Sequence, residues 1–239
     1  MISQVIYSLK VNDIFEAYMK NDKQEKKMSL RVITRVSFYY EALLKLDLPQ
    51  DSFISSKKLE EITGVSCNQV RQDFFYLGIS IGKQKKGYHV EKLFRALRRV
   101  LSVDRGAEVI VVGAGRLGRA LSEYKLFKIR NIHVTALFDV KPDLVGTIVD
   151  IKGRKTPIYH IERLEEYVKE NTHVKIALLT VPESVAQEIL DKLVELGIKG
   201  IVNYSPRILK LAKGIKGVQL VNDCIGASLY KVVYQIYHK

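Results

Sequence analysis

The chain has 239 residues, a length that suits one large domain or two modest ones. Hydrophobic residues make up 47% of it, and no apolar run approaches the roughly 18 residues that cross a bilayer, so no membrane partner is expected. The formal net charge of +13 favours a polyanionic partner, because lysine and arginine release the counterions condensed on phosphates.

Cysteines and histidines give no sign of a metal site or a disulfide framework. Cys67 and Cys224 lie far apart in the sequence, and the five histidines have no metal-ligand spacing. Residues 1–28 lack the apolar stretch of a secretory signal and are expected to form an N-terminal extension. A reducing, cytoplasmic location follows as the expectation.

Residues 29–100 have the pattern of a winged helix-turn-helix domain. Apolar residues recur at helical spacing before Leu48-Pro49 ends the first helix. Ser56 is expected to cap a second helix, and Thr63-Gly64-Val65 supplies the glycine turn. The apolar positions of the first helix are Val32, Val36, Tyr39, Leu43 and Leu46.

A third helix is predicted to start at Ser66, where Ser66 and Gln69 have the spacing of a capping box. Its apolar face is formed by Cys67, Val70, Phe74 and Leu77. The other faces carry Asn68, Arg71, Gln72 and Phe75. Arginine pairs with guanine and glutamine with adenine, so this helix is predicted to read bases in the major groove.

Two short strands, 79–81 and 88–90, are predicted around the basic loop of residues 82–87. Residues 83–99 hold seven basic residues and one acidic residue. Beside a helix-turn-helix, such a hairpin is typical of a DNA-contacting wing. A surface hairpin with solvated lysines is the alternative.

Residues 105–222 have the pattern of a dinucleotide-binding fold. The apolar run 108–112 predicts a buried parallel strand that leads into a glycine loop. There Gly113 permits the turn, Gly115 lets a pyrophosphate approach the backbone, and Gly118 allows close helix packing. The candidate cofactor-binding residues of this loop are Gly113, Ala114, Gly115, Arg116, Leu117 and Gly118.

A second predicted strand, 133–138, ends in Asp139, 21 residues after Gly118. A carboxylate there accepts hydrogen bonds from an adenosine ribose and repels a 2′-phosphate, which favours NAD(H) over NADP(H). Lys141 weakens that preference, and Asp139 could instead be a turn residue before Pro142.

Further strands are predicted at 174–179 and 200–203, each followed by loop residues. Strands that alternate with helices imply a parallel sheet, whose ligands bind at the carboxyl ends of the strands. Strand termination is the simpler role for these loops. The remaining candidate cofactor contacts are Val140, Thr180, Val181, Pro182, Asn203 and Tyr204.

Residues 223–239 are predicted to form a C-terminal helix with an apolar seam of Ile225, Leu229, Val232 and Ile236. Either the preceding domain or a second subunit could cover that seam. Palindromic operators favour two-fold dimers.

With both halves in place, the chain resembles the Rex family of redox-sensing repressors over residues 29–239. The motifs that carry the resemblance occur in order along the chain. They are Ile54-Ser55-Ser56-Lys57-Lys58-Leu59, Gln69-Val70-Arg71-Gln72-Asp73-Phe74, Gly82-Lys83, Gly87-Tyr88, Gly113 to Ala120, Phe138-Asp139-Val140, Pro157-Ile158-Tyr159-His160, Thr180-Val181-Pro182 and Gly200-Ile201-Val202-Asn203-Tyr204.

The resemblance implies a homodimer whose C-terminal helix is exchanged between the subunits. It also implies that NADH binding closes the dimer and withdraws it from its double-stranded operator DNA, whereas NAD⁺ leaves the DNA-binding form populated. It implies a switch formed by Arg35, Tyr124 and Asp223. The candidate DNA contacts are Ser55, Ser66, Asn68, Gln69, Arg71, Gln72, Lys83, Gln84, Lys85 and Lys86.

Three positions depart from the family pattern. Gln72 and Gln84 stand where the family usually has a cation, and Cys224 stands where it has an apolar residue. Loss of a guanine or phosphate contact changes affinity or base preference by about 1 to 3 kcal/mol. The operator sequence and the ligand response therefore do not follow from the resemblance alone.

Two alternatives remain for the function. An NAD-dependent dehydrogenase would use the same fold, but the chain has no substrate domain, and His160, in the predicted loop 156–161, is more simply a turn residue than a general acid. We therefore expect no enzyme. A DNA-binding regulator with another adenine nucleotide, such as a coenzyme A derivative, is the second alternative.

Overall fold

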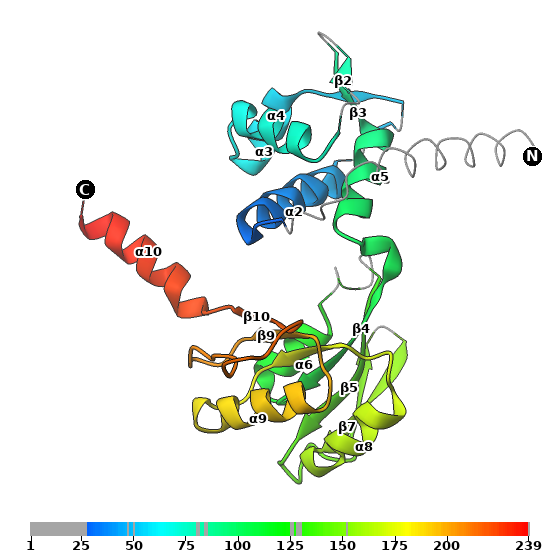
Figure 1. The fold of residues 1–239 in the computed structure, drawn as a ribbon, viewed down its shortest axis with the longest axis vertical. Helices are drawn as coiled ribbons and strands as arrows, with labels where there is room; N and C mark the ends of the chain where they lie inside the picture. Colours follow the sequence, from blue (N-terminus) through cyan, green and yellow to red (C-terminus); the bar gives the residue numbers. More distant parts are fainter. Residues whose placement is uncertain are drawn as a thin grey trace, which may run out of the picture. The chain divides into compact units, whose positions relative to one another are not determined.

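The computed structural model describes residues 28–238 except 47, 50, 80, 81, 84, 85, 125, 126, 128–130 and 152, and the side chain of residue 83. Within these residues the chain forms two compact units, 1–101 and 102–239 (Figure 1). The boundary lies where α5 ends, before the first strand of the large sheet.

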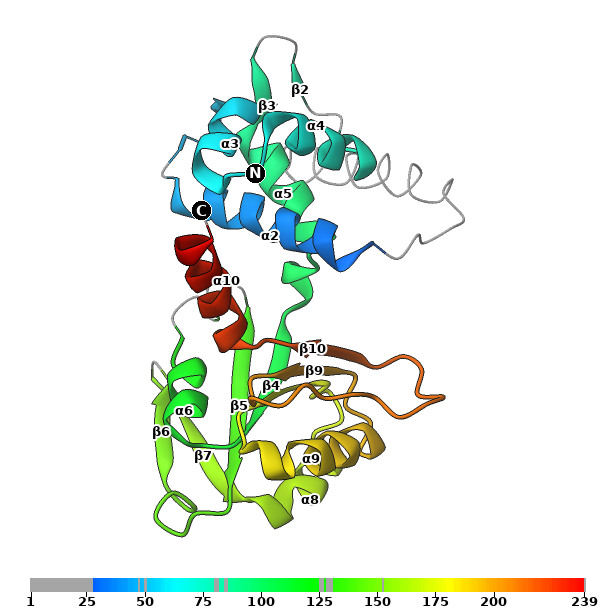
Figure 2. The ribbon, with the colours of Figure 1, turned by 90° about the vertical axis from the view of Figure 1, so that its left-hand side faces the viewer.

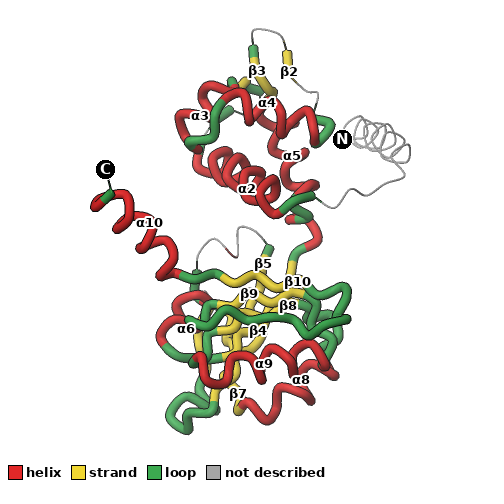
Figure 3. The backbone as a smooth tube through the Cα atoms, turned by 60° about the vertical axis from the view of Figure 1, so that its left-hand side comes forward, coloured by secondary structure: helices red, strands yellow, loops and turns green. Residues whose placement is uncertain are grey.

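Unit 1 combines helices with a small antiparallel sheet, in the order β1-β3-β2 (Figure 3). Its predicted winged helix-turn-helix fold is confirmed. The elements are α2 (Leu30–Lys45), β1 (Phe53–Ile54), α3 (Ser56–Thr63), α4 (Cys67–Tyr76), β2 (Gly82–Lys83), β3 (Gly87–His89) and α5 (Val90–Val100).

Aromatic packing holds α4 between α2 and the hairpin. Phe74 is 1% exposed, and its ring meets Tyr39 of α2 and Tyr88 of β3 edge to face, with centroids 5.2 and 4.8 Å apart. Gly87 lies where a Cβ atom would come within 2.4 Å of the carbonyl oxygen of Ile54. The hairpin base is thus fixed against both β1 and α4.

Two local predictions in unit 1 were wrong. Ser55, not Ser56, caps α3, since its hydroxyl accepts from the N–H of Lys58. In the hairpin, Gly82 of β2 pairs with Tyr88, and residues 80 and 81 of the strand expected at 79–81 lie outside the described residues. Val90 starts α5 instead of ending the second strand. A helix start and a strand end both favour apolar residues, so the local pattern did not separate them.

Unit 2 is an α/β unit around a seven-stranded sheet in the order β10-β9-β8-β4-β5-β7-β6, and its predicted Rossmann-like fold is confirmed. All neighbouring pairs are parallel except β6 and β7. Its elements are η1 (Val103–Arg105), β4 (Ala107–Val112), α6 (Arg116–Ser122), β5 (Ile132–Asp139), β6 (Ile148–Ile151), β7 (Arg154–His160), η2 (Ile161–Arg163), α8 (Leu164–Glu170), β8 (Ile176–Leu179), α9 (Glu183–Glu195), β9 (Gly200–Asn203), β10 (Gln219–Asn222) and α10 (Ile225–Tyr237).

Alternate residues of β4 point to opposite faces of the sheet. Ile110 and Val112 pack in the core that includes residues of α8 and α9, whereas Val109 and Val111 belong to the core on the other face. Figure 2 shows α8 and α9 together on one side and α6 on the other. The central strand is therefore buried on both faces, as its unbroken apolar run predicts.

The sheet reverses its order at β4. The chain moves from β4 to β5 on one side, and later places β8 on the other side of β4. Ligands of open α/β sheets bind in the crevice at such a point, outside the carboxyl ends of the strands. Gly113 and Thr180 follow the two strands that flank it.

The strand β7 corrects one prediction. His160, expected in a loop, ends β7 and pairs with Asp139 of β5. The hairpin of β6 and β7 was not predicted, because charged residues such as Arg154 and Lys155 interrupt the apolar alternation of an exposed edge.

The helix α10 has none of its residues buried and covers neither face of the sheet (Figure 1). Its seam residues Ile225, Leu229, Val232 and Ile236 are 62%, 63%, 51% and 61% exposed. The described residues of the preceding fold therefore leave this seam uncovered. Among the described helices, none is long and apolar enough to cross a membrane.

Candidate functional site

The glycine loop after β4 is held against the start of the loop after β8. Gly113 has φ +100°, and a Cβ atom there would lie 2.6 Å from the carbonyl oxygen of Thr180. The Thr180 hydroxyl donates to the carbonyl oxygens of Gly113 and Val112, at 2.7 and 3.2 Å. Gly113 thus permits a close backbone approach that any side chain would prevent.

Gly118 and Gly115 differ in what surrounds them. A Cβ atom on Gly118 would lie 1.9 Å from the carbonyl oxygen of Gly113, so glycine is needed for the first turn of α6 to pack against the loop. A Cβ atom on Gly115 would meet nothing within 4 Å. Gly115 is therefore free of packing constraints from the described residues, and its open side suits a group that comes close to the backbone.

The carboxylate of Asp139 lies beside this loop. Its Oδ2 accepts from the backbone N–H of Ala114 at 2.7 Å, and its Oδ1 accepts from the N–H groups of Val140 and Lys141 at 2.8 and 3.0 Å. The turn role considered for Asp139 is thus real, but the same carboxylate also ties the end of β5 to the glycine loop. This contact holds the carboxylate at Ala114, the residue before Gly115.

The remaining residues predicted around the loop are partly solvent-accessible. Arg116 and Leu117 form the first turn of α6 and are exposed, as is Val140, whereas Ala114 is buried. Val181 is half-buried, and Pro182 directly precedes α9.

Asn203 is a structural residue of the sheet end. Its side chain is buried, and its Nδ2 donates to the carbonyl oxygen of Arg207 and to the side-chain oxygen of Asn222. Its Oδ1 accepts from the N–H and hydroxyl of Ser205. The pKa of the neighbouring Tyr204 is raised, mainly by burial and to a smaller extent by the negative charge of Asp223. Asn203 therefore fixes the loop in which Tyr204 lies.

In unit 1, α4 presents a polar face to solvent. Asn68, Arg71 and Gln72 are exposed, and the Arg71 guanidinium donates to the side-chain oxygen of Asn68 at 2.6 Å. Ser66 caps the helix through the N–H of Gln69, as predicted. These side chains offer both donors and acceptors for base edges.

The second half of the predicted capping box is wrong. The Gln69 side chain donates to Asp73 at 2.9 Å. A capping box needs the Gln69 side-chain oxygen to accept from the N–H of Ser66, but the side chain is turned so that its NH2 group donates to a charged carboxylate, a stronger type of hydrogen bond. Gln69 is thus engaged inside unit 1.

Asp73 forms a buried ion pair that the sequence prediction missed. Its two oxygens accept from Nε and Nη2 of Arg35, both at 2.7 Å, and Oδ2 also accepts from the Tyr39 hydroxyl at 2.8 Å. Burial would raise the pKa of Asp73, but the hydrogen bonds from Arg35, Tyr39 and Gln69 outweigh it and hold the pKa below its ordinary value. An acidic residue on the apolar face, between Val70 and Phe74, was the available signal.

The residues predicted at the hairpin and at the first turn of α3 are placed only in part. Ser55 caps α3, Lys86 is exposed in the turn, and the backbone of Lys83 lies in β2. Gln84 and Lys85 lie outside the described residues.

The three residues of the predicted switch are distributed over both units. Arg35 is bound to Asp73 in unit 1. In unit 2, Tyr124 is 47% exposed and its ring meets Phe127 edge to face. The N–H of Asp223 donates to the carbonyl oxygen of Asn203.

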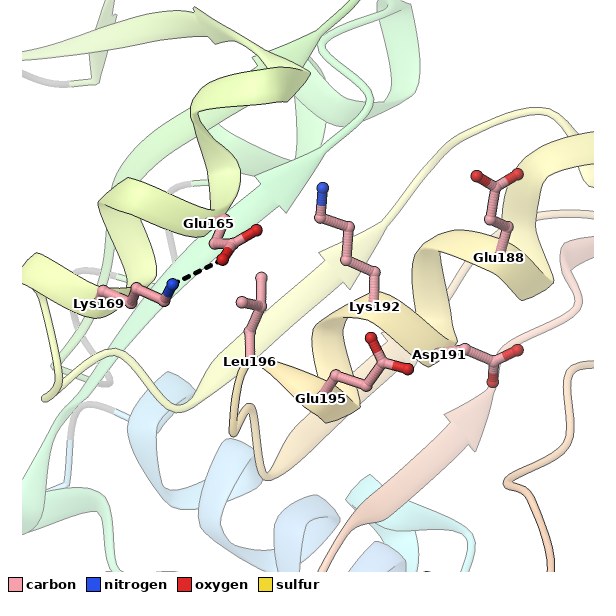
Figure 4. A pocket seen from close by; sticks show the side chains of 7 residues that line it. All are labelled: Glu165, Lys169, Glu188, Asp191, Lys192, Glu195 and Leu196. Atoms are coloured by element: carbon pink, nitrogen blue, oxygen red, sulfur yellow. Dashed lines mark hydrogen bonds and ion pairs between the residues drawn. The ribbon is translucent and has the colours of Figure 1, made fainter.

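A surface hollow of about 540 Å³ lies between α8 and α9 (Figure 4). Charged side chains dominate its lining. Two of them, Lys169 and Glu165 of α8, form an ion pair with 2.6 Å between Nζ and Oε1. None of the predicted site residues lines it, so we assign it no ligand. In the described part of the chain, no group of three or more histidines, cysteines or acidic residues could hold a metal ion.

Comparisons with known proteins cover both units. A family model described as "CoA binding domain" matches residues 104–207, and one described as "Putative DNA-binding protein N-terminus" matches residues 27–74. The redox-sensing transcriptional repressor Rex of Caldanaerobacter subterraneus subsp. tengcongensis is 37% identical over 212 residues, which cover 87% of this chain and 89% of the relative. The chain belongs to the Rex family.

Other Rex proteins agree. Rex of Anoxybacillus flavithermus is 36% identical over 217 residues, which cover 91% of this chain and 98% of that Rex protein. The crystal structure of RSP, a Rex-family repressor, in complex with β-NADH matches with a TM-score of 0.74 and 32% identity, and the match covers 89% of this chain and 95% of the RSP chain. The structure of RSP in complex with β-NAD⁺ and operator DNA matches with a TM-score of 0.76 and 34% identity, and the match covers 89% of this chain and 94% of the RSP chain. The resemblance inferred from the sequence motifs is confirmed.

Proposed function

We propose that this Rex-family chain is a redox-sensing transcriptional repressor that binds operator DNA, binds NAD(H), and leaves the operator when NADH binds. The observation that carries the proposal is the open face of Gly115 beside the carboxylate of Asp139, at the point where the strand order reverses. In the related RSP, structures exist with β-NADH and with β-NAD⁺ plus operator DNA.

The glycine loop supports binding of a dinucleotide. Gly115 gives a pyrophosphate access to the backbone, Asp139 accepts from ribose hydroxyls, and the exposed apolar side chains of Leu117 and Val140 offer contact to an adenine ring. Thr180 acts indirectly, because its hydroxyl holds the loop in place. The residues that we assign to the nucleotide site, either by contact or by holding the loops in place, are Gly113 to Gly118, Asp139, Val140, Thr180 to Pro182, and Asn203 with Tyr204.

We assign DNA binding to residues 29–100. Arg71, Gln72 and Asn68 are exposed on α4 and are the base-reading candidates, while Lys86 and Ser55 offer contacts to phosphates. Lys83, Gln84 and Lys85 belong to the same proposal. Gln69 supports the interface from inside, through Asp73.

We further propose a homodimer that forms through residues 223–239. The seam of α10 is more than half exposed at each of its four positions, and an apolar helix of this kind is stabilised when a second copy covers it. Arg35, Tyr124 and Asp223 would then transmit the response. We assign residues 1–28 to an N-terminal extension and residues 105–222 to the nucleotide domain. We place the protein in the cytoplasm.

We assign no catalysis to the chain. The polar side chains beside the loop, Thr180 and Asn203, direct their hydrogen bonds to the protein's own groups. A general acid has to reach a substrate atom, and these two side chains already hold the loops around the site. A regulator needs only binding, which this arrangement supplies.

A coenzyme A derivative is the second candidate ligand, because the family model for residues 104–207 is described as a CoA binding domain. Coenzyme A carries a phosphate on its adenosine ribose. The Asp139 carboxylate would repel that phosphate, as it would repel the 2′-phosphate of NADP(H). The charge at Asp139 therefore favours NAD(H).

Titration of the emission of NADH tests this assignment. Replacing Asp139 by Asn should weaken NADH binding about tenfold or more, the effect of one hydrogen bond to a charged group. Asp150→Asn is the matched control, because the Asp150 carboxylate also accepts from a backbone N–H but lies in the β6–β7 hairpin. Equal affinity in both variants, or displacement of NADH by stoichiometric coenzyme A, would overturn the ligand assignment.

A further inference from the structure

Phe75 is the most exposed aromatic side chain of α4, whose Tyr76 is 51% exposed. Phe75 is 88% exposed, whereas the adjacent Phe74 is 1% exposed and fills the core. The ring of Phe75 therefore offers an apolar surface to whatever α4 binds.

Phe75 lies on the same stripe of α4 as the base-reading candidates. At 100° per residue, it is about 20° from Asn68 around the helix and about 10 Å further along its axis. Arg71 lies between them along the axis, about 60° from Asn68 around the helix. Asn68, Arg71 and Phe75 are all exposed. The exposed stripe of α4 is thus polar at its start and apolar at its end.

The charge of this helix favours nucleic acid as the occupant. Asp73 is the one carboxylate among the ten residues of α4, and it is buried against Arg35. The solvent face of α4 therefore carries the positive charge of Arg71 and no acidic side chain. Such a face attracts a polyanion such as the phosphate backbone of DNA.

We propose that Phe75 is a specificity-determining residue that contacts the C5-methyl group of a thymine in the major groove. This inference rests on the proposed DNA-binding function. Among the base edges of the major groove, the thymine methyl is the apolar group, and phenylalanine is one of the side chains that contact it. Arg71 and Gln72 would read polar edges of neighbouring base pairs.

Deoxyuridine tests the contact, since it lacks only the methyl group of thymidine. Duplexes are first selected from a random pool with the full wild-type chain, and each thymine of the selected site is then replaced singly by deoxyuridine. At one thymine of a half-site, the wild type should lose about fourfold in affinity, the factor for burial of one methyl-sized group. Phe75→Ala should bind the thymine and deoxyuridine duplexes equally.

Phe38→Ala is the matched control, because Phe38 is an exposed phenylalanine of α2 at 47% exposure. It should keep the wild-type sensitivity to the methyl group. Wild-type binding that is indifferent to every replacement overturns the inference and leaves the repressor function standing. Failure of the wild type to select any sequence overturns the repressor function itself. If Phe75→Ala keeps the methyl sensitivity but changes the oligomeric state of the free protein, Phe75 faces a second copy, and the inference is wrong.

Discussion

The guanidinium of Arg35 on α2 and the carboxylate of Asp73 on α4 form two parallel hydrogen bonds, both 2.7 Å long. The side chain of Asp73 is 4% exposed and that of Arg35 is 25% exposed. The pair therefore fixes the helix that carries the candidate base-reading residues to the first helix of the unit. Bidentate pairs of this kind add geometric specificity as well as energy.

Replacing Asp73 by Asn should destabilise unit 1 by about 3 kcal/mol, because it leaves a partly buried guanidinium without its counter-charge. Urea denaturation followed by circular dichroism measures the loss. Glu61→Gln is the control, since Glu61 pairs with Lys58 on the exposed face of α3 and should cost less than about 1 kcal/mol. Equal losses would show that the buried pair contributes no more than a surface pair.

The same pair predicts a pH dependence. The folded-state pKa of Asp73 is lowered, so its contribution to stability is present above the unfolded-state pKa of about 3.9 and is lost as pH falls through the folded-state value. The wild type should lose this stability below about pH 4. Asp73→Asn should lack that part of the acid transition, which urea midpoints at several pH values would reveal. A difference in the free energy of unfolding between wild type and variant that stays constant down to pH 2 would contradict the assignment.

The three glycines of the loop should respond differently to alanine. Gly113→Ala and Gly118→Ala bring a Cβ atom onto backbone oxygens and should lower the melting temperature. Gly115→Ala meets only open space, so it should fold normally and lose NADH affinity by about tenfold or more through contact with the pyrophosphate. Thermal melts beside NADH titrations separate the two classes. Unchanged NADH affinity in Gly115→Ala would contradict the proposed approach of the ligand.

Thr180 should act on the nucleotide through the loop. Thr180→Val removes the hydroxyl that donates to Gly113 and Val112, and should cost about 1 to 2 kcal/mol of stability together with part of the NADH affinity. Thr180→Ser keeps the hydroxyl and should restore both. A Thr180→Val variant with wild-type affinity would show that the loop holds its shape without this bond.

The exposed seam of α10 predicts the oligomeric state. Leu229→Lys should convert a dimer to a monomer in sedimentation experiments without loss of helix content, because Leu229 is 63% exposed in the single chain. Lys231→Ala, off the seam, should leave the dimer intact. A Leu229→Lys variant that still dimerises would place the interface elsewhere.

Local patterns in the sequence were sufficient to predict the glycine loop, Asp139 and the exposed face of α4. These features follow from backbone requirements and helical spacing, which neighbouring residues reveal. The partners of Asp73 could not be predicted in this way, because Arg35 lies 38 residues away and the pairing depends on how α2 packs on α4. Gln69 is a different case, because Asp73 lies only four residues later on the same helix, and the capping-box assignment passed over this local i,i+4 pair.

Redox control of DNA binding is the central claim, and a duplex titration tests it most directly. Full-length protein bound to a selected operator duplex is followed by fluorescence anisotropy while NADH or NAD⁺ is added at fixed salt. NADH should weaken binding about a hundredfold, a coupling of about 2.7 kcal/mol between the two sites, whereas NAD⁺ should leave the complex intact. Operator affinity that does not change with NADH, at concentrations that saturate the nucleotide site, would contradict the proposed function.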